Sequence, residues 1–353
     1  MVRLAVLYLG KVSSTFANVN GGFRVRGAGR PSALEAGFRR IRPSKIPRAA
    51  FGTVIFPHYR PTCYHILDKY HDAARLEPAM TPTIAIIGAL EKEVRQIYHE
   101  IEHGTVAEDA GLTILGGEYC GFNLVATVAG MGTVNAAAAT QHLISRYGAN
   151  AVIFSGIAGG LNPQLHIDDV VIGACLRYID TDNALIAESK PNLMEYSSSD
   201  FLVKLAEETL IAHGYLDATL PDKAVAPGTP ARQAADASPF RRNNPSAPLR
   251  RYLVGTIATG NRFITGAEAR EAVVAATEAD CAEMEGAAVA HIAAKNGVDC
   301  LVLRAISDNC DEAYDAFCER EFDLDGYART ASSLTLAIVR RLSQKMGLYK
   351  PEA

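Results

Sequence analysis

The sequence of 353 residues has no stretch of about 18 consecutive apolar residues, so no membrane-spanning helix is expected. Tryptophan is absent, and none of the seven cysteines forms a CxxC pair or clusters with histidine at the spacing of a zinc site. Neither a structural metal nor internal repeats are expected. Cysteines inside apolar runs such as "DCLVLRAISD" indicate reduced, mostly buried thiols and a cytoplasmic location.

Acidic residues are scarce in the first part of the chain and abundant in the rest. Residues 1–80 hold 13 Lys and Arg against 4 Asp and Glu, whereas the remainder holds 22 against 35. Because the net charge changes from positive to negative so sharply along the sequence, the chain is expected to join two different parts. Because phosphates need cationic neighbours, the acidic main part is not expected to bind nucleic acid.

Residues 1–79 show no sustained period of 2 or 3.6, and they are rich in Arg, Gly and Pro. We expect a basic N-terminal extension with poor order and no catalytic residue. Met80 directly precedes the apolar run "TPTIAIIGAL", which favours a start site assigned too far upstream. An organelle transit peptide and a genuine basic tail are the alternatives.

Residues 80–348 alternate short β-branched runs with helical patterns, which predicts an α/β domain. The expected fold is a single three-layer α/β/α domain around a twisted, mostly parallel mixed sheet. Residues 216–248 break the pattern with Pro, Ala and charge, and are expected to form an exposed insertion. Strands are expected at 83–89, 123–130, 150–160, 168–180, 251–259 and 299–307, and helices at 90–101, 134–148, 198–214, from Gly266, at 283–297 and at 322–346.

A glycine turn in "LVATVAGMGTVNAA" lies between an expected strand and an expected helix. It invites comparison with a dinucleotide-binding motif, but Asn135 stands at the place of the third glycine, and no acid ends the next strand. A nicotinamide-dependent enzyme is therefore disfavoured. The turn is either a plain βα connection or a place where backbone N–H groups approach an anion or a ribose oxygen.

Acidic side chains lie at three expected strand ends or helix starts. Glu93 follows "IAIIGA", Glu285 lies in "CAEMEGAAVA", and Asp308 ends "LVLRAISD". Each alone is explained as a helix cap or turn residue. Because ligands bind at the carboxyl ends of strands in such sheets, the three together predict a site. Arg304 lies in an apolar run and needs a carboxylate partner, for which Glu93 is the expected choice.

The segments "IAIIGALEKEV", "AGMGTVNAA", "SGIAGGL", "GNRFITG", "EMEGAAVAHIA" and "VLRAISD" resemble, in this order, the purine and uridine phosphorylase superfamily. The segment "GALEKEV" is most similar to its 5′-methylthioadenosine/S-adenosylhomocysteine nucleosidase branch. The resemblance covers about residues 80–346 apart from the insertion, which is longer than expected. It implies a nucleoside phosphorylase-like fold and an enzyme that cleaves the N-glycosidic bond hydrolytically, yielding adenine and a thioribose product in nucleoside catabolism and methionine salvage.

The same resemblance implies roles for individual residues. Asp308 is expected to be the general acid near purine N7, and Glu93 the residue that activates the attacking water. Glu285 is expected to bind the ribose 2′- and 3′-hydroxyls. The remaining residues expected to bind substrate are Ile157, Ala158, Gly159, Phe263, Ile264, Met284, Arg304 and Ser307.

The resemblance implies no metal or organic cofactor, a nucleoside substrate with water as co-substrate, and a homodimer whose partner loop closes the 5′ pocket. Ile157 stands where family members often have Ser or Val, so the pocket is expected to be tighter. The aromatic residue of the 5′ pocket is either Phe317 or Phe322.

Three alternative functions remain at the level of sequence. A nucleoside phosphorylase would use phosphate as nucleophile, but neither glycine turn carries an arginine, and Glu93 would repel the anion. A hydrolase of futalosine-type nucleosides would share the same acids. A nucleoside-binding sensor without activity is marked by the loss of one acid, and none is lost here.

Overall fold

The computed structural model describes residues 81–238, 242, 246, 248–311 and 323–349. All of them belong to one compact unit, and the predictions for residues 1–79 and for Phe317 and Phe322 lie outside the described residues.

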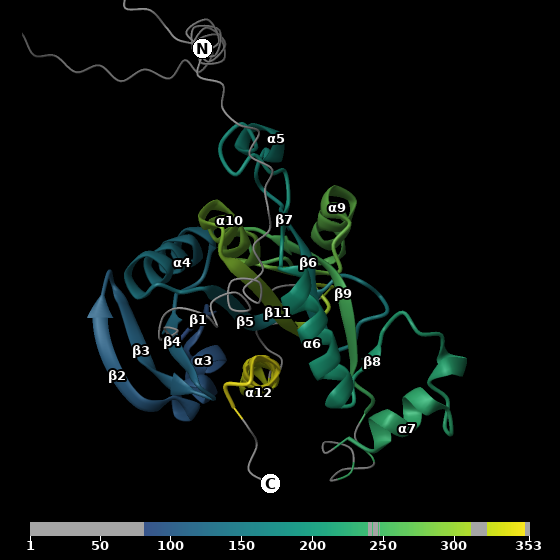
Figure 1. The fold of residues 1–353 in the computed structure, drawn as a ribbon. Helices are drawn as coiled ribbons and strands as arrows, with labels where there is room; N and C mark the ends of the chain where they lie inside the picture. Colours follow the sequence, from purple (N-terminus) through teal and green to yellow (C-terminus); the bar gives the residue numbers. More distant parts are fainter. Residues whose placement is uncertain (1–80, 239–241, 243–245, 247, 312–322, 350–353) are drawn as a thin grey trace, which may run out of the picture. The chain divides into compact units, whose positions relative to one another are not determined.

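Strands and helices alternate along most of the described chain (Figure 1). The strands are β1 (Thr83–Gly88), β2 (Glu102–Asp109), β3 (Leu112–Tyr119), β4 (Phe122–Val128), β5 (Ala151–Gly160), β6 (Val170–Tyr178), β7 (Tyr196–Ser197), β8 (Leu216–Asp217), β9 (Arg251–Thr259), β10 (Cys281–Glu283) and β11 (Asp299–Asp308). The α-helices are α3 (Glu91–Glu100), α4 (Thr133–Tyr147), α5 (Asn183–Ile186), α6 (Asp200–Ala212), α7 (Pro230–Asp236), α9 (Ala267–Thr277), α10 (Gly286–Asn296) and α12 (Leu324–Met346).

The strands form one mixed sheet with the order β10-β9-β6-β11-β5-β1-β4-β3-β2. The central strands β11, β5, β1 and β4 run parallel to one another. The short strand β10 pairs with β9 on one side and with β5 on the other. Five strands therefore close into a ring at one end of the sheet, and the last residues of β5 lie beside β10.

Helices cover both faces of the sheet, with α4 and α10 on one face and α3, α6 and α12 on the other (Figure 1). Strand β1 shows why both faces are covered, because its residues alternate between two buried clusters. Ala85 and Ile87 pack in the cluster that includes α4 and α10, whereas Ile84 and Ile86 pack in the one that includes α6 and α12. The predicted three-layer fold with a mixed, largely parallel sheet is confirmed.

Several elements differ from the sequence-based expectation. The hairpin β2–β3 was not predicted, since every residue of β2 except the last is exposed and its pattern shows no apolar alternation. The predicted helix 283–297 begins only at Gly286, because the preceding residues pair with β9 as β10. Within the predicted insertion, α7 packs on Leu216 and Val225 in a small buried cluster.

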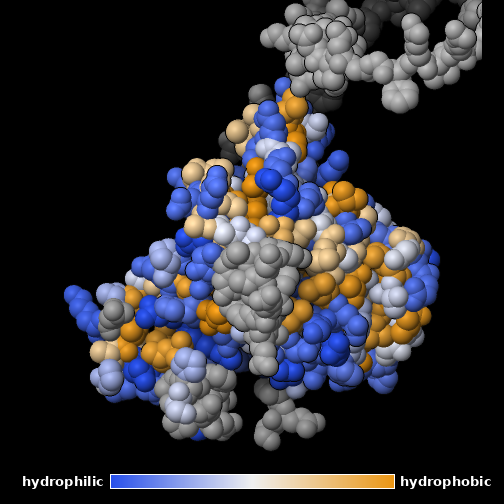
Figure 2. Space-filling model, turned by 180° about the vertical axis from the view of Figure 1, so that it is seen from behind, coloured by the Kyte–Doolittle hydropathy of each residue, from blue (hydrophilic) through white to orange (hydrophobic). Residues whose placement is uncertain are grey.

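The surface mixes charged and apolar side chains on the face shown in Figure 2. The segment around α5 extends away from the sheet (Figure 1), and it exposes Leu185, Leu193 and Met194. Of the helices that the structure describes, not one has both the length and the apolar character that a bilayer crossing demands. Five described cysteines are free thiols, and three of them are buried.

Candidate active site

A cavity of about 130 Å³ lies where β1, β5, β10 and β11 end and where α3 and α10 begin. All of the site residues predicted from the sequence line it except Arg304, which lies buried behind it. The topology thus brings together side chains more than 200 positions apart in the chain. The cavity is lined by Ala89, Leu90, Glu93, Met131, Ile157, Ala158, Gly159, Arg262, Phe263, Ile264, Ala282, Glu283, Met284, Glu285, Ser307, Asp308 and Cys310.

Glu93 is buried in the first turn of α3, and backbone N–H groups hold its carboxylate. One oxygen accepts from Ala89 N at 2.7 Å and from Leu90 N at 2.9 Å, and the other accepts from Ile157 N at 3.0 Å. A carboxylate has about four acceptor positions, so about one is left for a further donor. Burial raises the pKa of Glu93, while the charge of Arg304 and the three N–H groups oppose the rise.

Glu283 and Glu285 lie on either side of Met284 and meet the same guanidinium. Arg304 Nη2 forms a close ion pair with Glu283 and lies 3.7 Å from Glu285 Oε2. Arg304 also packs over the ring of Phe154, with 4.2 Å between Cζ and the ring centroid. The ion pairs of Arg304 are therefore with Glu283 and Glu285, and the prediction that Glu93 is its partner is wrong. Glu93 acts on Arg304 only through its charge.

Gly156 in β5 allows this arrangement. A Cβ at this position would overlap both Nη1 of Arg304 and Oε1 of Glu93. Any larger residue at this position would displace Arg304 or Glu93.

Glu285 faces the cavity from the start of α10, and its Oε1 accepts from Gly132 N at 2.7 Å. The glycine turn before α4 thus contacts the acid. Burial, followed by the charge of Glu283, raises the pKa of Glu285 to about 7, although Arg304 opposes the rise. The carboxyl group therefore changes its charge near neutral pH.

Asp308 ends β11 after an irregularity in the pairing with β5, and it is buried. Ser307 Oγ donates to Asp308 Oδ2 at 2.8 Å, and Cys310 N donates to Oδ1 at 3.0 Å. A Cβ on Gly159 would overlap Cys310 Sγ and crowd Asp308 Oδ1, so glycine is needed there. The acid is held at the cavity wall by short, local contacts.

Sequence reasoning missed several residues of this site. Glu283 received no role, because the sequence places it at the mouth of a helix and not in a strand. The sequence did hold an indication, because Glu283 and Glu285 are two residues apart, and side chains at that spacing lie on the same side of an extended segment. Met131, Arg262 and Cys310 were not predicted either, because they lie in turns whose course depends on tertiary contacts. In the part of the chain that the structure describes, no group of three His, Cys, Asp or Glu side chains is arranged to hold a metal ion.

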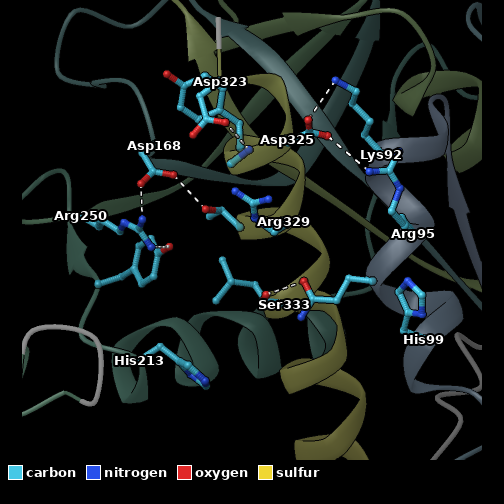
Figure 3. Close-up of a pocket in the computed structure, with 16 residues that line it drawn as sticks. Lys92, Arg95, His99, Asp168, His213, Arg250, Asp323, Asp325, Arg329 and Ser333 are labelled. Carbon is cyan, nitrogen blue, oxygen red and sulfur yellow. Dashed lines mark hydrogen bonds and ion pairs between the residues drawn. The ribbon is translucent and has the colours of Figure 1, made fainter. Parts of the chain in front are cut away.

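A second and larger hollow, of about 750 Å³, lies between α3, α6 and α12 (Figure 3). None of the predicted site residues lines it. Its acids are engaged within the protein, since Asp168 pairs with Arg250 and Asp325 lies 3.2 Å from Lys92. Such partly exposed pairs are weak and solvated. The buried, mutually interacting acids at the strand ends therefore mark the smaller cavity as the candidate active site.

Comparison with known proteins agrees with this geometry. The model of the phosphorylase superfamily matches residues 83–342. The 5′-methylthioadenosine/S-adenosylhomocysteine nucleosidase of Treponema pallidum is 31% identical over 262 residues, which cover 74% of this chain and 94% of the relative. The aminodeoxyfutalosine nucleosidase of Campylobacter jejuni is 26% identical over 268 residues, covering 74% and 99%.

Among solved structures, the chain is similar to the 5′-methylthioadenosine/S-adenosylhomocysteine nucleosidase of Neisseria meningitidis in complex with methylthio-immucillin-A. The TM-score is 0.57 at 27% identity, over 73% of this chain and 98% of the other. The family model spans most of the described domain and every element that contributes to the cavity. The chain belongs to the phosphorylase superfamily.

Proposed function

We propose that the protein hydrolyses the N-glycosidic bond of 5′-methylthioadenosine and S-adenosylhomocysteine, releasing adenine and the thioribose product. The observation that carries the proposal is the charge of the cavity: Glu93, Glu283, Glu285 and Asp308 are buried around Arg304, the one arginine that is buried among the described residues. Breaking this bond develops positive charge on the ribose ring. A buried surplus of carboxylates stabilises that charge where water cannot screen it.

Departure of the base is assigned to Asp308. Adenine leaves poorly as an anion, and a proton on N7 lets it leave as a neutral molecule. Asp308 has the position for this transfer, since it lines the cavity and Ser307 Oγ and Cys310 N fix its two oxygens. A positioned general acid contributes roughly 10²–10⁴-fold to a rate.

Attack by water is assigned to Glu93. Its three N–H contacts hold the carboxylate still and leave about one acceptor position for a water molecule. Burial raises its pKa and so makes it a better base than an exposed glutamate. Glu285 binds the vicinal ribose hydroxyls, which donate to its carboxylate.

The base and sugar are enclosed by the other predicted residues. Phe263 is assigned to stack on adenine, Ile264 to bind the base through its backbone, and Met284 to pack against the ribose, since all three line the cavity. Ile157, Ala158 and Gly159 form the glycine-rich end of β5 beside the sugar, and Ile157 contributes its N–H to Glu93 whatever its side chain.

The test is adenine release from 5′-methylthioadenosine and from S-adenosylhomocysteine, with and without phosphate. We expect the same rate in both buffers, because the acidic cavity disfavours an anionic nucleophile. A requirement for phosphate would make the protein a nucleoside phosphorylase and refute the hydrolytic proposal.

Hydrolysis of an aminodeoxyfutalosine-type nucleoside is the second candidate, favoured by the relative from Campylobacter jejuni. The same acids would cleave the same kind of bond, so only the 5′-substituent differs. A panel in which that nucleoside is cleaved and the two thio-nucleosides are not would select this alternative.

A homodimer and a cytoplasmic location belong to the same proposal. Leu185 and Met194 on the projecting α5 segment are 62% and 60% exposed, and Val134 at the start of α4 is 79% exposed. Exposed apolar side chains of this kind suit a subunit interface. Light scattering should give twice the chain mass for the wild type, and a Met194→Asp variant should lower it. Free, buried thiols support a reducing, cytoplasmic setting.

A further inference from the structure

Glu283 is a buried carboxylate that adds to the charge of the cavity but has no individual role in the proposed reaction. Its Oε1 accepts from the hydroxyl of Thr259, and its Oε2 accepts from Glu285 N at 3.0 Å, from Gly286 N at 2.7 Å and from the guanidinium of Arg304. A carboxylate has about four acceptor positions. Four donors from the protein therefore already hold this carboxylate, three of them on Oε2.

The start of α10 is capped by a residue that precedes the usual capping position. Glu285 is the N-cap residue, yet its side chain makes no capping bond. Glu283 takes two of the free backbone N–H groups instead, and Thr259 Oγ accepts from Ala287 N at 2.9 Å. Because an N-cap side chain normally fills this place, Glu283 frees the carboxylate of Glu285 to face the cavity.

We propose that Glu283 is a positioning residue: by holding Arg304 and the start of α10, it sets where the carboxylate of Glu285 lies and at which pH it carries its charge. The inference rests on the proposed function, in which ionised Glu285 binds the ribose hydroxyls. Glu283 acts through its neighbours and does not touch the substrate.

Charged groups from three elements surround Glu285. Glu283 comes from β10, Arg304 and Asp308 from β11, and Glu93 from α3, while the N-cap residue of α4 adds a backbone N–H. Burial comes first among the causes that raise the pKa of Glu285, and the charge of Glu283 comes second. Removing that charge also leaves Arg304 to Glu285 alone. Both effects lower the pKa of Glu285.

Two substitutions separate the effect of the charge of Glu283 from the effect of the length of its side chain. Glu283→Gln removes the charge and keeps the shape, whereas Glu283→Asp keeps the charge and shortens the side chain. We measure kcat and KM for adenine release between pH 5 and 9, with circular dichroism to establish folding. Glu91→Gln is the matched control, because Glu91 is an exposed acid of α3 with a side chain 73% exposed.

In Glu283→Gln, the fall of kcat/KM on the acidic side of the pH profile (the acidic limb) should move to lower pH by about one unit or more. The reason is that Glu285 loses a like charge at close range. Glu283→Asp should keep the limb of the wild type but lose kcat roughly 10-fold or more, because a misplaced group slows the reaction. Glu91→Gln should change neither quantity.

A Glu283→Gln limb at the wild-type pH would overturn the inference, as would equal movement of the limb in both variants. If Glu283→Gln does not fold, Glu283→Asp decides alone, and a wild-type kcat in that variant overturns the positioning role. A wild type without nucleosidase activity would instead refute the proposed function. The pKa of Glu285, followed by carboxyl ¹³C NMR in wild type and variants, would then still test the charge relation.

Discussion

Replacing Glu285 by Gln should make the folded protein more stable at neutral pH while it destroys activity. Glu285 is 5% exposed, and burial with the charge of Glu283 raises the pKa of its carboxyl group from the usual 4.5 to about 7. Each pKa unit corresponds to about 1.4 kcal/mol, so ionised Glu285 costs the folded state about 3 kcal/mol at pH 8. A neutral amide of the same shape avoids this cost.

The effect has a defined pH window. Because the pKa is raised on folding, the stability associated with Glu285 is fully present below about pH 4.5 and is lost as pH rises to about 7. Urea unfolding of wild type and Glu285→Gln, at one protein concentration, should therefore give similar midpoints at pH 4.5. At pH 8 the variant should be more stable by about 3 kcal/mol.

The control is Glu91→Gln, which removes the same charge from the protein surface and should change stability by less than about 0.5 kcal/mol. A Glu285→Gln variant no more stable than wild type at pH 8 would refute the reasoning. So would a gain of equal size at both pH values, since that would show that the charge is not its origin.

Three further predictions follow from the same contacts. Asp308→Asn should lower kcat for adenine release by roughly 10²–10⁴-fold with little change in adenine affinity by calorimetry; a smaller loss would assign the acid elsewhere. The wild-type kcat/KM should fall as pH drops below about 7, where Glu285 gains a proton, and a flat profile from pH 6 to 8 would contradict that role. Gly156→Ala should lower the free energy of unfolding by about 1–3 kcal/mol, measured with heat or urea, and should remove activity, because its Cβ overlaps Arg304. Gly116→Ala is the control and should be tolerated, since the nearest atom to its Cβ lies at 3.7 Å.

The sheet and its helices could be predicted where burial of an element requires a regular pattern of apolar residues in the sequence. Strand β1 is a continuous apolar run because both of its faces are covered, and Gly148 ends α4 in the left-handed conformation that glycine favours. Strand β2 could not be predicted, since its exposed residues are held by pairing with β3 and not by their own preference.

The candidate site was predictable as a set of strand-end acids but not as a network. The sequence indicates that Arg304 needs a carboxylate, yet it does not rank three acids that converge from different elements. Arg304 pairs with Glu283 because β10 is extended at that point, and its pairing with β9 and β5 makes it so. Local preference near "EMEGAAVA" favours a helix, and the tertiary pairing overrides it.

Strand β10 is only three residues long, yet it joins β9 to β5 and ends in Glu283. The strand pairing that closes the ring therefore also aligns the acids, so the fold and the site depend on the same contacts. Ala258 and Ala282 face each other across the β9–β10 pairing. Small packing defects beside either residue should lower kcat well before they unfold the protein.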